Sequence, residues 1–179
     1  MYKRQAYEFG NGISAAAGAQ FTETGIATDE TNDSYALNLA YSADSYGVSL
    51  TMAETGADGL QGVYTAVNGY YSFGNSLNIS AGYEVGDLDG HLASADETEA
   101  YFVGINGEVG PGELGAAAGT YGKMTESSSV MPERMMYEVY YSYAVNDGMT
   151  ITPLIFTKEQ SSATTMDETG IMVKTSFSF

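Results

Sequence analysis

The sequence predicts an all-β protein folded as one antiparallel meander. Apolar side chains recur at every second position along most of the chain, and no segment shows the period of an amphipathic helix. The connections between these runs are alternately short and long. The runs have about 9–11 residues, the length of a tilted strand that crosses a bilayer. We therefore expect a transmembrane β-barrel, present here as about ten to eleven strands.

The alternation is clearest in three runs. In the first of them, Ile79, Ala81 and Tyr83 alternate with Ser80 and Gly82, so that one sheet face is apolar and the other is small or polar. The clear runs are 77–86, 137–145 and 171–179; weaker ones cover 13–21, 35–43, 46–52, 101–107 and 114–122, and 63–73 and 149–158 are less regular. A short run at 6–9 precedes them.

The connections predict which strand ends lie together. Short ones at 10–12, 43–45, 74–76, 110–112 and 146–148 alternate with longer ones at 22–33, 54–61, 87–98, 125–134 and 159–168. Gly with Asn or Asp in a short connection is typical of a tight hairpin. Tight turns at one end and long loops at the other are typical of transmembrane barrels. Tyr and Phe near the strand ends predict aromatic girdles at the two membrane interfaces.

Composition excludes several classes of protein. The 179 residues include 23 acidic and 6 basic side chains, a formal net charge of −17, and no Cys. Without Cys there is no disulfide framework, thiolate metal site or Cys nucleophile. The negative charge would repel a phosphate backbone, so no nucleic-acid partner is expected. A secreted β-sandwich, a β-solenoid or a soluble β adhesin remains an alternative to the barrel.

The first five residues, MYKRQ, have the sequence that the end of a common sequencing adapter encodes when its first codon is a start. We interpret residues 1–5 as an adapter scar, to be left out of fold reasoning. Residues 6–179 are then the C-terminal part of one β-barrel domain whose N-terminal half is missing.

The last run carries the most specific signal. Its apolar positions include Ile171, Val173, Phe177 and Phe179, and Phe179 is the final residue. We interpret these four residues as a signal for the outer-membrane barrel-assembly machinery. The alternative is that Phe177 and Phe179 are ordinary lipid-facing girdle residues, and the two interpretations are compatible.

Two stretches carry a family resemblance. YEVYYSYAVNDGMTITP at 137–153 resembles the final hairpin of cyanobacterial outer-membrane porins of the carbohydrate-selective, OprB-type group, also named iron-uptake porins, and MVKTSFSF at 172–179 is similar to their ending. Before this the resemblance is architectural. It implies a barrel of about sixteen strands, an even number as in other bacterial barrels. It also implies a homotrimer in the outer membrane and transport of carbohydrate or inorganic ions, with no cofactor.

The alternation assigns polar residues to the pore side of the wall. They are Gln20, Asn38, Asn78, Glu84, Asn106, Glu108, Glu138, Tyr140 and Lys174. Many Gly, Ala and Ser on the same face favour an open, water-filled channel. The three carboxylates against one Lys predict a preference for cations.

The densest acidic stretch is expected to be a solvated outer loop. It contains Asp87, Asp89, Asp96, Glu97 and Glu99, which would enrich cations at the pore mouth. A calcium site is the alternative, but the spacing does not fit an EF-hand loop, and no metal is expected. The single histidine, His91, lies in the same stretch without a nucleophile motif nearby, so no catalysis is expected.

The expected function is that of an outer-membrane porin that lets small hydrophilic solutes or ions diffuse passively. The alternative is an outer-membrane barrel that acts as an envelope anchor or adhesin without significant transport. The expected partners are outer-membrane lipid, the assembly machinery and further copies of the same chain.

Overall fold

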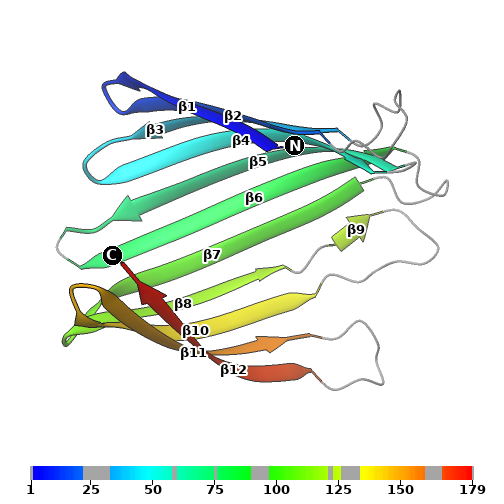
Figure 1. Ribbon diagram of the computed structural model, residues 1–179. Coiled ribbons are helices and arrows are strands. Elements are labelled where there is room, and N and C mark those ends of the chain that lie inside the picture. Colours follow the sequence, from blue (N-terminus) through cyan, green and yellow to red (C-terminus); the bar gives the residue numbers. More distant parts are fainter. Residues whose placement is uncertain are drawn as a thin grey trace.

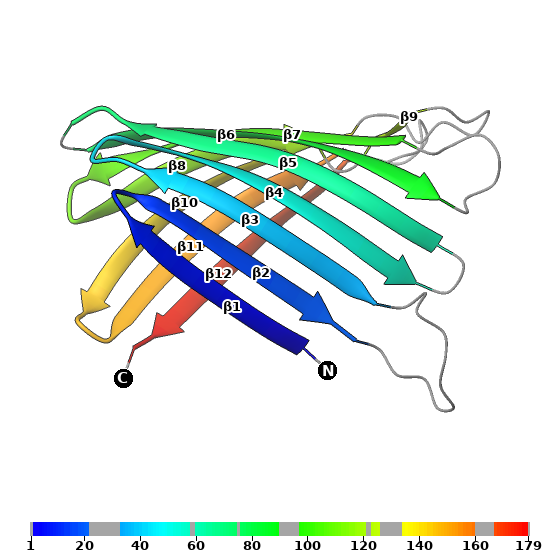
Figure 2. The ribbon, with the colours of Figure 1, turned by 90° about the horizontal axis from the view of Figure 1, so that it is seen from above.

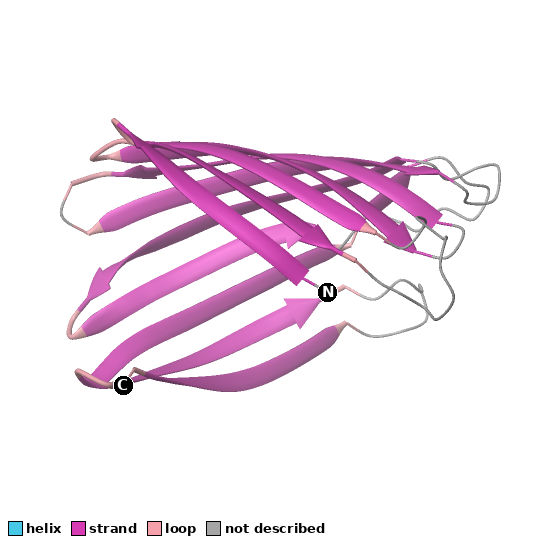
Figure 3. Ribbon diagram, turned by 45° about the horizontal axis from the view of Figure 1, so that its top comes forward, coloured by secondary structure: helices cyan, strands magenta, loops and turns pink. Residues whose placement is uncertain are grey.

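The chain forms one large β-sheet. The computed structural model describes residues 2–21, 33–57, 60–74, 76–89, 97–120, 123–125, 134–159 and 167–178. These residues contain strands and turns and no helix (Figure 3), so no helix of this part is long and apolar enough to span a membrane. The strands are β1 (Tyr2–Gly10), β2 (Ile13–Gln20), β3 (Ser34–Ser42), β4 (Tyr46–Ala57), β5 (Leu60–Ser72), β6 (Leu77–Asp89), β7 (Glu97–Val109), β8 (Gly112–Thr120), β9 (Lys123–Thr125), β10 (Met135–Asn146), β11 (Met149–Lys158) and β12 (Glu168–Phe177).

The sheet is a meander in which strands that follow one another in the chain pair antiparallel. The order is β1-β2-β3-β4-β5-β6-β7-β8-β10-β11-β12, and the short β9 pairs with β7 away from this path. The tight turns that join β1 to β2, β3 to β4, β5 to β6, β7 to β8 and β10 to β11 all lie at one end of the sheet, on the left in Figure 1. The predicted all-β antiparallel meander is therefore confirmed.

The sheet curves into an open trough. Seen from above, β1 and β12 lie at its two free margins, while β6 and β7 lie across the opposite wall (Figure 2). In the described part of the chain β1 pairs only with β2, and β12 pairs only with β11. The expected partial barrel is thus a curved, unclosed sheet.

Local turn chemistry explains the tight ends. At the first turn Gly10, Asn11 and Gly12 all have positive φ angles, of 83°, 51° and 79°. Gly adopts this left-handed region without steric cost, and Asn tolerates it better than most residues. At the last turn the backbone N–H of Gly148 donates to Oδ1 of Asn146 at 2.9 Å. Such side-chain bonds favour Asn in turns.

The register sorts side chains onto two different faces. Leu39, Leu50 and Val67 lie opposite one another on β3, β4 and β5, and all three are exposed on the convex face. The adjacent row, Asn38, Thr51 and Ala66, lies on the concave face. Among the described residues no apolar side chain is buried, so this single layer has no hydrophobic core. Its apolar surface faces outward, as expected of a wall that contacts lipid.

Aromatic side chains form two belts on the convex face. The first lies near the tight turns and contains Phe9, Tyr41, Tyr46, Tyr71, Phe73, Tyr143 and Phe177, and the second lies toward the other strand ends and contains Tyr35, Tyr83, Tyr101 and Tyr137. All of these rings are exposed. In the second belt the Tyr83 hydroxyl donates to Oε1 of Glu99 at 3.0 Å. An apolar ring with a polar tip suits a membrane interface.

The strands extend further than the sequence predicted on the side opposite the tight turns. β4 continues to Ala57 and β5 begins at Leu60, within the predicted connection 54–61. β6 continues to Asp89 and β7 begins at Glu97, within the predicted connection 87–98. Backbone pairing continues past the apolar alternation here, because a ladder of hydrogen bonds does not require apolar side chains.

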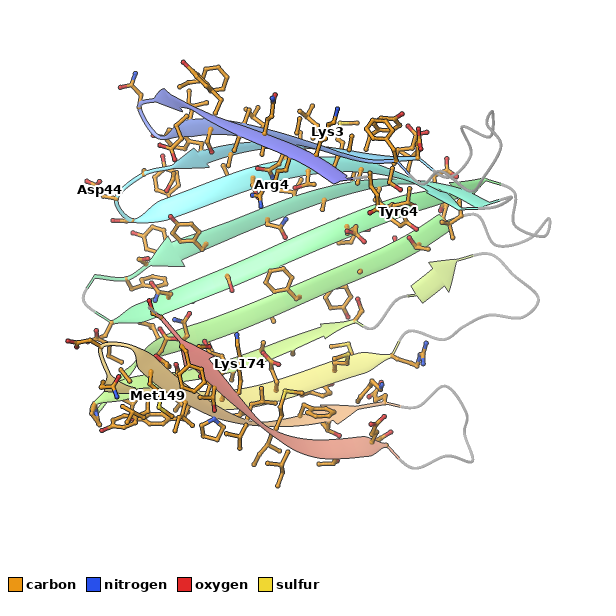
Figure 4. The ribbon with its side chains drawn as sticks, viewed as in Figure 1. Lys3, Arg4, Asp44, Tyr64, Met149 and Lys174 are labelled. Carbon is orange, nitrogen blue, oxygen red and sulfur yellow. The ribbon has the colours of Figure 1, made fainter. Side chains whose placement is uncertain are left out.

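Residues 2–5 extend β1 in the structure. Lys3 and Arg4 project to opposite sides of this strand (Figure 4). By register Lys3 and Gln5 share the convex face with Ala19 and Ala17, and Arg4 lies on the concave face. Two polar side chains therefore interrupt the apolar face within the segment interpreted as an adapter scar.

An added charged side chain should destabilise the protein more on the convex face than on the concave face. Leu50→Arg puts a guanidinium in the middle of the convex apolar face, where its desolvation in lipid should cost about 2–4 kcal/mol of unfolding free energy. The neighbouring Ser49→Arg puts the same group on the concave face and should cost much less. Urea titration of the full-length protein refolded in lipid vesicles measures both values. Equal losses in the two variants would contradict the assignment of faces.

Candidate functional site

The candidate site is the concave wall of the trough. All nine residues predicted to line a pore lie on this face by register: Gln20, Asn38, Asn78, Glu84, Asn106, Glu108, Glu138, Tyr140 and Lys174. They come from six strands between β2 and β12, because the two-residue period repeats from strand to strand across the sheet. Asn38, Asn78, Glu84, Asn106 and Tyr140 are half-buried, and the other four are exposed.

One carboxylate on this wall accepts hydrogen bonds from the side chains of two neighbouring strands. Asn106 Nδ2 donates to Oε2 of Glu113 at 2.8 Å, and the Tyr140 hydroxyl donates to Oε1 at 3.1 Å. These contacts span β7, β8 and β10 and fix the side chain of Glu113 from both sides. Both donors thereby hold the carboxylate group close to the wall.

Glu113 is absent from the predicted pore lining. It lay between the predicted connection 110–112 and the predicted run 114–122, whereas β8 begins at Gly112. Val109 and Gly112 are the pair beside the tight turn. One residue further from the turn, Glu108 and Glu113 are direct partners on the concave face. Counting outward from the tight turn would have identified this pair.

Carboxylates outnumber bases on the concave face of the described strands. The acidic residues are Glu8, Glu84, Glu108, Glu113, Glu138 and Glu168, and the basic ones are Arg4, Lys158 and Lys174. One base is paired with an acid, because Lys158 Nζ lies 3.4 Å from Oε2 of Glu168. The wall therefore carries a net negative charge along its length, which attracts cations.

A hollow of about 480 Å³ lies against the middle of the concave wall. It forms over Ala117 and Gly119 of β8, whose small side chains leave space between β7 and β10. Phe102 lies on one side of it and Glu138 on the other, with Glu84 also contributing to its lining. The wall here is lined by small and apolar surface with carboxylates beside it.

The predicted acidic loop is wrong in its placement. Asp87 and Asp89 belong to β6, and Glu97 and Glu99 belong to β7, while Asp96 lies outside the described residues. Asp87 pairs with Val63 and Glu97 in a convex-face row. Because strand pairing extends into this stretch, the side chains of Asp87, Glu97 and Glu99 point outward beyond the tyrosine belt and not into the mouth of the trough.

The predicted assembly signal lies on the free margin of the sheet. Ile171, Val173 and Phe177 are on the convex face of β12 and are 78%, 61% and 62% exposed. Phe179 lies outside the described residues. The last strand thus presents an apolar stripe beside an edge that has no strand partner in the described part of the chain.

Possible metal ligands do not cluster in the described part of the chain. Within those ranges, no group of three or more His, Cys, Asp or Glu side chains could hold a metal ion. His91 lies outside them.

Comparison with known proteins identifies the architecture. No protein-family model matches the sequence, and no curated protein matches it. Among solved structures, the chain is similar to an anion-selective porin from Comamonas acidovorans, with a TM-score of 0.79 and 16% identity over 98% of this chain and 58% of that one. A second porin has a TM-score of 0.74 and 17% identity over 98% of this chain and 60% of the porin.

A smaller barrel is also similar, though less so. The KdgM porin, solved in complex with disordered oligogalacturonate, has a TM-score of 0.56 and 9% identity over 99% of this chain and 91% of the porin. At these identities the likeness establishes the fold alone. The chain has the fold of a porin barrel wall and spans about three-fifths of the length of the first two porins named above.

The Glu113 contacts predict energetic coupling along the wall. In a double-mutant cycle of Glu113→Gln and Tyr140→Phe, the single changes should each weaken folding, and the pair should lose less than their sum. The expected interaction energy is about 0.5–1.5 kcal/mol, the net value of a typical hydrogen bond. Urea titration of the refolded protein gives the four free energies. Strict additivity would show that Tyr140 does not hold this carboxylate.

Proposed function

We propose that this chain is part of an outer-membrane porin through which small hydrophilic solutes and ions diffuse passively. The observation that carries the proposal is the division of one porin-fold sheet into two faces. The convex face is apolar and bounded by aromatic belts, and the concave face is polar, with many small residues. A wall of this kind separates lipid from a water-filled lumen. No step of this function requires a nucleophile, a cofactor or a metal.

We further propose that residues 6–179 form the C-terminal part of a barrel of about sixteen strands, within the range of bacterial barrels. The similarity to two larger porins supports this, because the alignment covers 98% of this chain but only 58% and 60% of theirs. The two free margins at β1 and β12 also require further strands for closure, since open edges are not tolerated in lipid. The interruption of the apolar face at Lys3 and Gln5 supports treating residues 1–5 as an adapter scar.

The finer family assignment rests on the sequence. The stretches 137–153 and 172–179 resemble cyanobacterial OprB-type porins, which favours carbohydrate or inorganic ions as the solutes. In this proposal the partners are outer-membrane lipid on the convex face, the assembly machinery at β12 and two further copies of the protein in a trimer. The apolar stripe of Ile171, Val173 and Phe177 supports the first two.

We propose that the pore prefers cations. The excess of carboxylates on the concave face supports this, with Glu113 held by Asn106 and Tyr140 and with Glu84 and Glu138 beside the central hollow. Fixed charges in a lumen select permeant ions by their sign. The anion selectivity named for the Comamonas porin belongs to that protein, since lumen charge varies independently of fold.

The reversal potential of the full-length protein in a planar bilayer under a salt gradient tests this function. We expect a large conductance with cation preference. Combined Glu84→Gln, Glu113→Gln and Glu138→Gln changes should shift the reversal potential toward zero, because they remove negative charge from the lumen. As a matched control, Glu54→Gln removes a carboxylate from the convex face and should leave the potential unchanged.

Each alternative outcome has a distinct meaning. Absence of conductance in protein that is folded in the bilayer would contradict the porin function and favour an anchor or adhesin. Conductance with anion preference would keep the porin and contradict the assignment of selectivity to these carboxylates.

A further inference from the structure

A repeated pairing occurs on the concave wall between aromatic residues and glycines. Every concave-face aromatic side chain that the structure describes has a glycine as its direct partner on a neighbouring strand. The pairs are Tyr64 with Gly86, Tyr70 with Gly47, Phe102 with Gly82, Tyr140 with Gly115 and Phe156 with Gly170. These pairs lie in strands from β4 to β12 and therefore recur across most of the wall.

In each pair the ring lies over the backbone of its glycine. A β-carbon added to Gly86 would lie 2.6 and 2.7 Å from two ring carbons of Tyr64, and one at Gly47 would lie 2.9 Å from Cζ of Tyr70. At Gly115 the added carbon would be 2.5 Å from the Tyr140 hydroxyl oxygen. Gly82 and Gly170 are covered in the same way by Phe102 and Phe156. No side chain larger than hydrogen fits under these rings without moving them.

The burial of the glycines also shows that aromatic rings cover them. Among the residues whose exposure the structure describes, the only buried ones are Gly47, Gly62, Gly86 and Gly115. Gly47, Gly86 and Gly115 are partners in the pairs, and Gly62 lies under the same Tyr64 ring as Gly86. In a single-layer sheet with no core, these are the places where side chains are packed most closely against the wall.

Elementary strand geometry explains what the glycines do. Side chains stand roughly perpendicular to a sheet, so an aromatic ring normally projects away from it. Opposite residues have β-carbons about 4.5–5.5 Å apart, and a partner β-carbon occupies the space into which the ring could fold. A glycine leaves that space empty, so that the ring folds down and covers the glycine backbone.

We propose that these glycines set the width of the pore by keeping the lumenal rings flat against the wall. The inference rests on the proposed porin function and concerns which residues determine its size limit. Two rings are also tethered along the wall: the Tyr70 hydroxyl lies 3.0 Å from Oγ of Ser42, and the Tyr140 hydroxyl donates to Glu113. The aromatic residues thus cover backbone without obstructing the lumen.

The test uses the full-length protein in planar bilayers. Gly47→Ala and Gly115→Ala should each lower the single-channel conductance, because the new methyl lifts Tyr70 or Tyr140 into the lumen. The double variants Gly47→Ala/Tyr70→Ala and Gly115→Ala/Tyr140→Ala should recover the wild-type conductance or exceed it. Gly18→Ala is the matched control, since its added carbon on the concave face would meet only the Lys3 carbonyl oxygen, at 3.7 Å.

A second measurement does not depend on the glycine variants folding. Tyr70→Ala alone should change the conductance little, because a flat ring takes up little of the lumen. A marked rise in conductance for Tyr70→Ala would overturn the proposal, and so would unchanged conductance in both glycine variants or a loss that the double variants do not reverse. A wild-type protein that does not conduct would instead contradict the porin function itself.

Discussion

The hydrogen-bond ladder between neighbouring strands is the interaction on which the rest of this structure depends. The described part of the chain contains no buried apolar side chain, so no hydrophobic core holds the strands together. In hydrocarbon each unpaired backbone group costs several kcal/mol, and in the described part of the chain a ladder that runs from β1 to β12 pairs each strand with its neighbours. Because pairing fixes the register, it also fixes which side chains share a face. The apolar convex face and the polar concave face are both consequences of this one constraint.

The concave wall is polar, and its side chains lie close to the sheet. Its polar side chains bond sideways to their neighbours, as in the contacts of Asn38 with Thr51 and of Ser142 with Thr152. Its aromatic rings lie over glycines, and its charged residues include a carboxylate held from two strands. Each arrangement keeps side-chain atoms close to the sheet. The same small residues that weaken a strand in a soluble protein are therefore an advantage in a wall whose concave side must remain open.

Much of this fold could be predicted from the residues, because a two-residue period and tight-turn signals are local properties. The turn signals at 10–12 and 146–148 predicted two hairpins that the structure contains. The alternation predicted one shared face for nine lining residues, and the register places all nine on it. Strand ends were less predictable, since Asp87 and Glu97 pair as strand residues although both are charged. The pairing of Gly115 with Tyr140 depends on a register between strands joined by a long connection, which no local pattern specifies. Glu113 could have been found from the turn beside it.

The most direct test of the two-faced wall is a scan of single cysteines along β6 in the full-length protein, with any cysteine outside these 179 residues first replaced, since these residues contain none. Each variant in intact vesicles is exposed to a thiol reagent that dissolves in water and does not enter lipid. We expect strong labelling at Asn78, Ser80 and Glu84 and weak labelling at Ile79, Ala81 and Tyr83. Uniform labelling, or labelling on the opposite set of positions, would contradict a wall that separates water from lipid.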